Sequence, residues 1–131
     1  MIYDTSAAIS WYVDLPWSTA ARRIVSDDPE PYAPDLIVAE AANGLWKYVR
    51  VRGMTEALAL AALDHLQAAL ILTDTKALGR RAFSLAVALD HPVYDCFFLA
   101  LAEERRGPVV TADRRLAGLA GNAGIEALAI S

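Results

Sequence analysis

Four carboxylates stand out because each lies at or near a predicted junction between a strand and a helix. Asp4 directly follows a short apolar segment at the start of the chain, and Asp113 follows an apolar run across one alanine. Asp95 begins a predicted helix, and Glu40 lies within the apolar stretch 36–42. A carboxylate among apolar residues is costly unless it is paired, neutralised or bound to a metal. These four acids are therefore the candidates for chemistry.

Four carboxylates at one edge of a sheet would repel one another strongly unless a cation lay among them. Mg²⁺ and Mn²⁺ prefer oxygen ligands, and Mg²⁺ is usually held by one or two carboxylates with waters and substrate phosphates. The histidines show no zinc-site spacing: His65 lies in the middle of a predicted helix and His91 precedes a proline. We interpret both histidines as surface or core-edge residues, and we expect a hard-cation site.

Each acid also has a purely structural interpretation. Asp95 and Asp113 could be ordinary helix caps or first-turn acids, which are stabilised by the helix dipole. Asp4 could simply solvate a strand end. Asp74 occupies a similar position, and we interpret it as a cap. The expected convergence of four acids at one edge favours chemistry over capping.

The elements that would position these acids alternate between short strands and helices. The predicted strands cover residues 2–4, 32–33, 71–73, 109–111 and 125–130. The predicted helices cover residues 5–13, 17–26, 34–52, 55–70, 76–89, 95–105 and 113–119. This order predicts an α/β/α sandwich with a short, mainly parallel central sheet flanked by helices. Sites in such folds form beyond the carboxyl ends of the strands.

Length and composition predict one globular domain over residues 1–131, of which 56% are hydrophobic and 21% charged. The single cysteine, Cys96, excludes an intramolecular disulfide and fits a reducing compartment. The apolar stretch 57–73 is interrupted by polar residues and cannot span a membrane. No signal peptide is expected, because Asp4 comes too early. We expect a soluble, cytoplasmic protein.

The net charge is −4, from 12 basic and 16 acidic residues. Passive nucleic-acid binders usually carry a basic face. A chain of this charge can act on nucleic acid only if bound cations offset its acidic cluster and local basic residues contact the backbone.

The segments around the four acids resemble motifs of the VapC-type toxins, which belong to the PIN-domain superfamily. The similar segments are Ile2-Tyr3-Asp4-Thr5-Ser6-Ala7, Glu40-Ala41-Ala42-Asn43, Tyr94-Asp95-Cys96-Phe97-Phe98-Leu99-Ala100-Leu101-Ala102 and Val110-Thr111-Ala112-Asp113-Arg114-Arg115-Leu116. They occur in the family's order and spacing, and together they span nearly the whole chain. The resemblance implies a PIN-like fold and a metal-dependent endoribonuclease that is the toxin of a toxin–antitoxin pair.

The resemblance also implies roles for particular residues. One or two Mg²⁺ or Mn²⁺ ions would be held by Asp4, Glu40, Asp95 and Asp113. The metal would activate a water for in-line attack on a phosphodiester, leaving a 5′-phosphate and a 3′-hydroxyl. Ser6 and Thr111 would orient carboxylates or the water. Asn43 would bind Glu40 or a phosphate.

Local basic residues are the candidates for holding the RNA backbone: Lys47 and Arg50 on the Glu40 face, and Arg114 and Arg115 beside Asp113. Their alternative is an ordinary solvated helix surface. The RNA target is expected to be single-stranded or looped, because its bases can then be splayed out.

Partners are also implied by the resemblance. VapC-type toxins are typically neutralised by an antitoxin whose tail lies in a hydrophobic groove and blocks the acids. An antitoxin arginine there would make a charge-assisted contact. Homodimerisation is a further expectation. Candidates to line the groove are Trp11, Tyr12, Leu15, Trp17 and Trp46, although aromatic residues at these spacings are also typical of a core.

Three alternatives compete with the nuclease. A PIN fold could serve only as a binding or assembly module. A receiver-like Mg²⁺-binding signalling domain would have paired acids after its first strand and a lysine after its last, whereas no lysine follows Lys76 here. A phosphatase with an aspartate nucleophile would have a second aspartate two residues after the first, where this chain has Ser6.

Overall fold

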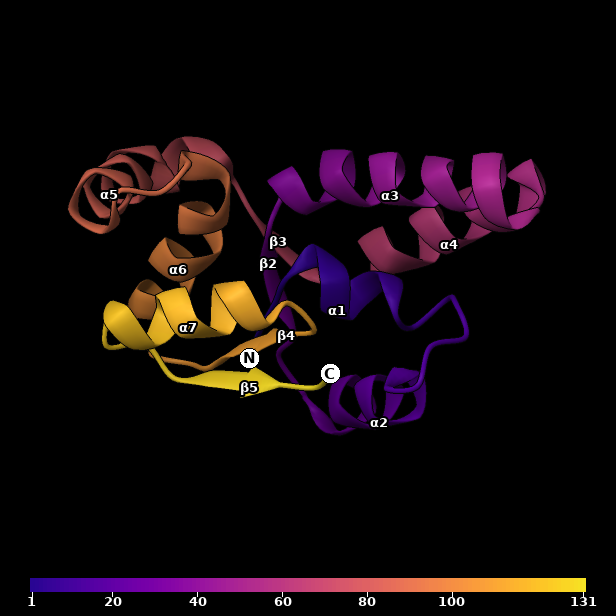
Figure 1. Cartoon of the computed structure of the whole chain (residues 1–131), viewed down its shortest axis with the longest axis horizontal. Helices are drawn as coiled ribbons and strands as arrows, with labels where there is room; N and C mark the ends of the chain where they lie inside the picture. The colour runs from indigo at the N-terminus through magenta and orange to yellow at the C-terminus, as the bar shows by residue number, and fades with distance from the viewer.

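A five-stranded sheet lies at the centre of the computed structural model, which describes residues 1–131 (Figure 1). Its strands are β1 (Ile2–Tyr3), β2 (Tyr32–Pro34), β3 (Ile71–Thr73), β4 (Val109–Thr111) and β5 (Ala127–Ala129). The strand order is β3-β2-β1-β4-β5, and every neighbouring pair is parallel. The predicted parallel sheet is therefore confirmed. Because all strands run the same way, their carboxyl ends lie along one edge.

The strand order also excludes one alternative. Receiver-like domains have the flavodoxin-like order 2-1-3-4-5. Here β1 lies between β2 and β4, and β3 is an edge strand. The receiver-like interpretation is therefore wrong.

Seven helices flank the sheet and complete the predicted sandwich. They are α1 (Thr5–Ile9), α2 (Ser18–Asp27), α3 (Leu36–Arg52), α4 (Glu56–Ala69), α5 (Thr75–Leu89), α6 (Val93–Arg105) and α7 (Arg114–Asn122). In Figure 1, α3 and α4 pack side by side at one end of the molecule, and α5 and α6 pack together at the other.

Local signals in the sequence set most helix ends. Gly53 ends α3 in the left-handed conformation, with φ of 71°. The Thr55 side chain accepts a hydrogen bond from Leu58 N at 3.2 Å and caps α4. Asp74 caps α5 by accepting from Lys76 N at 2.8 Å. The predicted capping role of Asp74 is confirmed.

Two predicted helix boundaries are wrong in ways that matter for the site. The helix expected over residues 5–13 ends at Ile9, because Trp11 N and Tyr12 N turn back to the carbonyls three residues earlier. The helix expected to begin at Asp95 begins at Val93, directly after Pro92. Asp95 consequently lies inside the first turn of α6.

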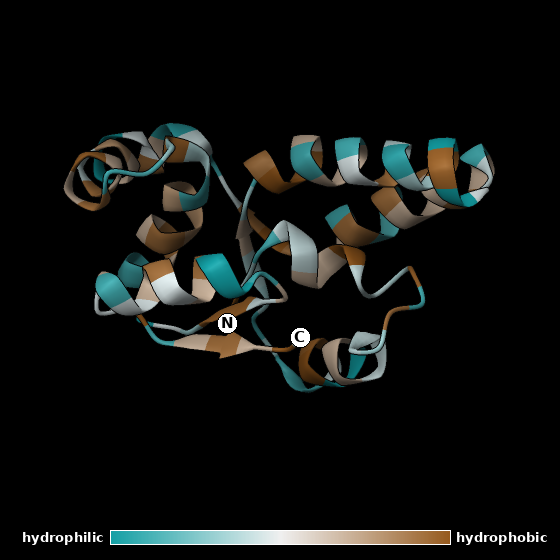
Figure 2. Cartoon of the chain, in the orientation of Figure 1, coloured by the Kyte–Doolittle hydropathy of each residue, from teal (hydrophilic) through white to brown (hydrophobic).

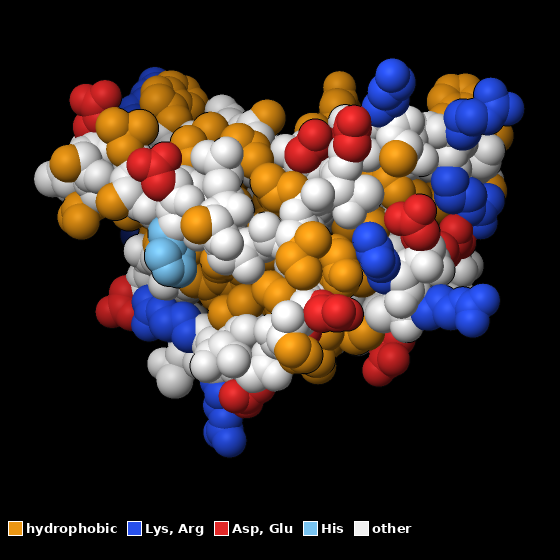
Figure 3. Space-filling view, turned by 180° about the vertical axis from the view of Figure 1, so that it is seen from behind, with side chains coloured by type: hydrophobic (Ala, Val, Ile, Leu, Met, Phe, Trp, Pro, Cys, Tyr) orange, Lys and Arg blue, Asp and Glu red, His pale blue; other side chains and the backbone are white.

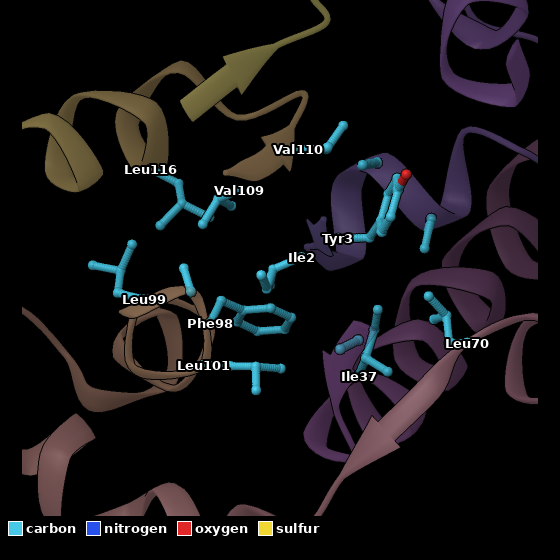
Figure 4. Close-up of a cluster of buried hydrophobic side chains, with 14 of the residues drawn as sticks. Ile2, Tyr3, Ile37, Leu70, Phe98, Leu99, Leu101, Val109, Val110 and Leu116 are labelled. Carbon is cyan, nitrogen blue, oxygen red and sulfur yellow. The ribbon is translucent and has the colours of Figure 1, made fainter. Parts of the chain in front are cut away.

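Helix α6 supplies much of the core, as its apolar turns in Figure 2 show. Phe98 and Leu101 are almost fully buried, and in the close-up of Figure 4 Phe98 lies beside Ile2 of β1. Val109 of β4 is also fully buried. Cys96 is buried on the same helix, in an apolar setting. The interior therefore fixes α6 against β1 and β4, the strands that precede Asp4 and Asp113.

A close approach of α1 and α3 depends on Gly44. A Cβ atom added at Gly44 would overlap the end of the Ile9 side chain. Glycine at this position lets the two helices pack closely. As a result Glu40, one helical turn before Gly44, comes within hydrogen-bond reach of Thr5.

None of the helices, taken singly, combines the length and the apolar character that a membrane span requires. Helices α5 and α6 have the length and composition only when taken together, and the chain bends by 115° between them.

Candidate active site

Asp4 lies just beyond β1, 5% exposed, and a hydrogen bond reaches each of its carboxylate oxygens. Ala7 N donates to Oδ1 at 2.8 Å, which caps α1. The Ser6 hydroxyl lies 2.7 Å from Oδ1 and 2.9 Å from Oδ2, and the Thr111 hydroxyl donates to Oδ2. Ala112 N donates to Ser6 Oγ at 2.9 Å. This network links the ends of β1 and β4 through one buried carboxylate.

Burial raises the pKa of Asp4 to about 6. The hydrogen bonds from Thr111, Ala7 and Ser6 act in the opposite direction, and the negative charge of Asp113 adds to the rise. Asp4 and Asp113 are therefore close enough to repel each other electrostatically. That repulsion is what the sequence predicted for acids meeting at this edge.

Glu40 lies half-buried on α3, where its Oε1 accepts a hydrogen bond from Thr5 Oγ1 at 2.7 Å. Burial raises the pKa of Glu40, and the negative charge of Asp95 raises it further. No hydrogen bond joins Glu40 to Asn43, the predicted partner. The hydrogen-bond partner of Glu40 is Thr5 instead. Sequence spacing could not reveal this contact, because it joins α1 to α3.

Asp95 accepts two hydrogen bonds on the same oxygen. His91 Nε2 lies 2.8 Å from Oδ2, and an Arg115 guanidinium nitrogen lies 3.2 Å from it. His91 is not among the residues that the sequence predicts for the site. Its only signal in the sequence was its position four residues before Asp95, just ahead of the helix.

Asp113 caps α7 and also contacts the cluster. Its Oδ1 accepts from Arg115 N at 2.9 Å and from Leu116 N at 3.4 Å, so the capping interpretation describes real contacts. Its Oδ2 lies 3.7 Å from the Arg115 guanidinium. Arg115 thus bridges Asp95 and Asp113 with one positive charge.

The four acids lie around one edge of the sheet, where the negative charge of Asp113 helps to raise the pKa of Asp4 and that of Asp95 helps to raise the pKa of Glu40. No group of three or more acidic, histidine or cysteine side chains is close enough to form a ready-made metal site. The donor chemistry nevertheless fits a hard cation, because Glu40 Oε2 and Asp95 Oδ1 have no hydrogen-bond partner in the protein.

A cleft of about 510 Å³ opens beside these acids. Glu40 and Asp113 line it on the acidic side, together with the hydroxyls of Thr5 and Ser6. Asn43 and Lys47 of α3 also line it, and Leu15 and Trp17 form an apolar wall. The cleft therefore combines two carboxylates, the positive charge of Lys47 and an apolar surface.

The other predicted basic residues are placed differently. Arg50 lies over the Trp46 ring, 5.4 Å from its centroid, and does not line the cleft. Arg114 reaches the carbonyl of Ser131 at 3.5 Å. Only Arg115 contacts the acids.

The five residues expected to line one hydrophobic groove are dispersed. Trp11 is 8% exposed and packs edge-on against Tyr3, so it belongs to the core. Tyr12 is bonded to His65 at 2.6 Å. Trp46 lines a separate apolar groove of about 310 Å³ between α3 and α4. Figure 3 shows hydrophobic side chains exposed at the end of the molecule formed by these two helices. A single groove formed by all five residues is therefore wrong.

Comparisons with known proteins agree with this architecture. The model of the PIN domain family matches residues 1–122. Ribonuclease VapC3 of Pyrobaculum aerophilum is 36% identical over 120 residues, which cover 89% of this chain and 92% of that protein.

Two solved structures share the fold. The crystal structure of PAE2754 from Pyrobaculum aerophilum superposes with a TM-score of 0.71 at 23% identity, covering 90% of this chain and 84% of that one. A toxin–antitoxin complex from Klebsiella pneumoniae gives a TM-score of 0.68 at 17% identity, covering 99% and 97%. With its matching family model, its relative and its sheet, the chain belongs to the PIN-domain family.

Proposed function

We propose that this protein is a metal-dependent endoribonuclease that acts as the toxin of a toxin–antitoxin pair. The observation that carries the proposal is that Glu40 and Asp113 line one cleft, while Ser6 of that cleft donates to Asp4 and Arg115 joins Asp95 to Asp113. The relative named a ribonuclease and the neighbour solved as a toxin–antitoxin complex support the same activity.

The four acids would hold one or two Mg²⁺ or Mn²⁺ ions. When bound, the metal supplies an activated water and stabilises charge on the leaving oxygen. The protein's own contribution is orientation. Ser6 and Thr111 donate to Asp4 and keep that carboxylate fixed, while Thr5 fixes one oxygen of Glu40. The free oxygens of Glu40 and Asp95 are the ones available to a cation.

RNA is the substrate that fits the cleft. Lys47 and Asn43 are exposed and line it, so they can bind phosphate oxygens. Trp17 on the apolar wall offers a surface on which an unpaired base can stack. Single-stranded or looped RNA meets both demands. We place Arg114 and Arg50 outside this contact, because neither lines the cleft.

The apolar groove between α3 and α4 is our candidate for antitoxin binding. It is lined by seven apolar side chains, and Trp46 is 52% exposed beside it. We take this exposed apolar surface as the place where a partner chain would bind.

We further propose that the protein forms a homodimer and is cytoplasmic. We also propose one PIN-like domain over residues 1–131, because β5 lies beyond the residues that the family model matches and yet pairs with β4.

The proposal is tested with purified protein and single-stranded or looped RNA, in Mg²⁺ or in EDTA. The substitution Asp95→Asn should abolish cleavage without unfolding the protein. Asp74→Asn is the matched control, because Asp74 also caps or begins a helix yet lies in none of the acidic contacts. It should cleave as the unmodified protein does.

A binding-only PIN protein remains the second candidate, and this assay separates the two. Cleavage that requires metal and disappears only in Asp95→Asn establishes the nuclease. Binding of RNA without cleavage by any preparation would favour the binding-only protein instead. Equal cleavage by Asp95→Asn and Asp74→Asn would remove Asp95 from the site.

A further inference from the structure

His91 occupies the turn between α5 and α6, and its backbone is fixed there. The preceding residue, Asp90, adopts the left-handed conformation with φ of 50°. His91 N donates to Ala86 O at 3.1 Å, and Pro92 follows with φ of −53°. The backbone therefore sets where the imidazole can reach.

The imidazole reaches only one oxygen of Asp95. His91 Nε2 lies 2.8 Å from Oδ2, and because an ionised carboxylate can only accept, Nε2 donates. The His91 side chain is 13% exposed, whereas that of Arg115, which donates to the same oxygen at 3.2 Å, is 67% exposed. Asp95 Oδ1 accepts no hydrogen bond. One donor that is mostly buried and one that is exposed thus leave a single oxygen free.

We propose that His91 is a positioning residue for Asp95: by holding Oδ2, it turns Oδ1 toward the bound cation. The inference deepens the proposed function and rests on Asp95 being a metal ligand. Groups that orient a ligating carboxylate from behind tune metal affinity strongly, and their loss typically costs 10- to 100-fold. Arg115 cannot replace His91, because its exposed side chain is free to turn away.

A competing interpretation is that His91 only stabilises the turn. The turn already has backbone hydrogen bonds from Asp90 N to Val87 O and from His91 N to Ala86 O. Helices α5 and α6 also pack closely against each other. The imidazole hydrogen bond is therefore not needed to form the turn, which makes the two interpretations separable by experiment.

The test measures Mn²⁺ affinity of metal-stripped protein by isothermal titration calorimetry. The substitutions His91→Phe and His91→Asn both remove a donor at the Nε2 position, the first by chemistry and the second by length. Each should weaken Mn²⁺ binding about 10-fold or more. His91→Gln places an amide nitrogen at about the reach of Nε2 and should recover most of the affinity. Melting temperatures without metal should be alike.

His65→Phe is the matched control, because His65 is the other histidine and bonds Tyr12 rather than an acid. It should bind Mn²⁺ as the unmodified protein does. Unchanged affinity in both His91→Phe and His91→Asn would overturn the proposal, as would a His91→Gln variant as weak as His91→Asn. Failure of the unmodified protein to bind Mn²⁺ would instead overturn the metal site itself, and the role of His91 with it.

Discussion

The two halves of the acidic cluster differ in how completely the protein satisfies them. Asp4, at the end of β1, is buried and has donors on both carboxylate oxygens. Asp95, on α6, is partly exposed and has donors on one oxygen only. Under the proposed function, the first acid would serve the fold as well as the site, while the second would have one oxygen open to a ligand. Substitutions should separate these two tasks.

The largest expected effects come from removing the two acids in turn. Asp4→Ala and Asp95→Ala should each reduce RNA cleavage by about 1000-fold, the upper range for losing one electrostatic group of an active site. Single-turnover cleavage in saturating Mg²⁺ measures this. Residual activity within tenfold of the unmodified protein for either variant would exclude that acid from the chemistry.

Stability should distinguish the same two variants. Asp4→Ala removes a helix cap and leaves the donors of Ser6, Thr111 and Ala7 without their acceptor, which should cost about 2–4 kcal/mol. Asp95→Ala should cost less than about 1 kcal/mol, since its partners are a partly exposed histidine and an exposed arginine. Urea unfolding of the metal-free proteins measures both. Equal losses in the free energy of unfolding would mean that Asp4 and Asp95 contribute equally to the stability of the fold.

The pH dependence of stability should report Asp4 specifically. Its pKa is raised to about 6 in the folded protein from 3.8, so between these values the folded state binds more protons than the unfolded state. Stability contributed by this group therefore falls as pH rises from about 4 to 6. Metal-free unmodified protein should lose stability over this window relative to Asp4→Asn, which cannot titrate. Parallel pH profiles for the two proteins would contradict the raised pKa.

A smaller effect is expected from separating α1 and α3. Gly44→Val should overlap Ile9, cost about 1–3 kcal/mol and move Glu40 away from Thr5, lowering activity about tenfold. Adding Ile9→Ala creates room and should restore part of the activity. Measured rates for the single and double variants test this. A double variant no better than Gly44→Val would show that the contact with Ile9 is not what places Glu40.

The smallest effect should follow from removing the exposed charge. Arg115→Gln should strengthen Mn²⁺ binding by up to about fivefold, because it removes a positive charge that repels the cation beside Asp95 and Asp113. Arg114→Gln is the control, since Arg114 contacts only a backbone carbonyl. Isothermal titration calorimetry of the two variants measures and compares their Mn²⁺ affinities. Weaker Mn²⁺ binding by Arg115→Gln would contradict this prediction and would show instead that the guanidinium helps to hold the carboxylates for the cation.

The sequence predicted the parts of this arrangement that depend on local pattern. Short apolar runs bounded by Asp4 and Asp113 marked the ends of two strands, and the cap at Asp74 and the stop at Gly53 were legible in the same way. The alternation of strands and helices then placed the ends of the strands together.

Contacts between distant elements were not predictable from that pattern. Thr5 meets Glu40 only because Gly44 lets α1 approach α3, and Arg115 meets Asp95 only because α6 and α7 both pack against β4. Trp11 was misplaced for the same reason: the early end of α1 turns it into the core beside Tyr3. Periodicity places a side chain on a face, while packing decides what that face meets.

Anomalous data collected at the manganese edge from a crystal soaked in MnCl₂ would show whether the four acids bind a divalent cation. We predict one or two manganese peaks within bonding distance of at least two of the four acids, with Asp95 Oδ1 and Glu40 Oε2 among the ligands. Manganese peaks found only on other surfaces would contradict the assignment of these acids as the metal site. The same holds if no peak lies near the acids although the protein cleaves RNA with Mn²⁺.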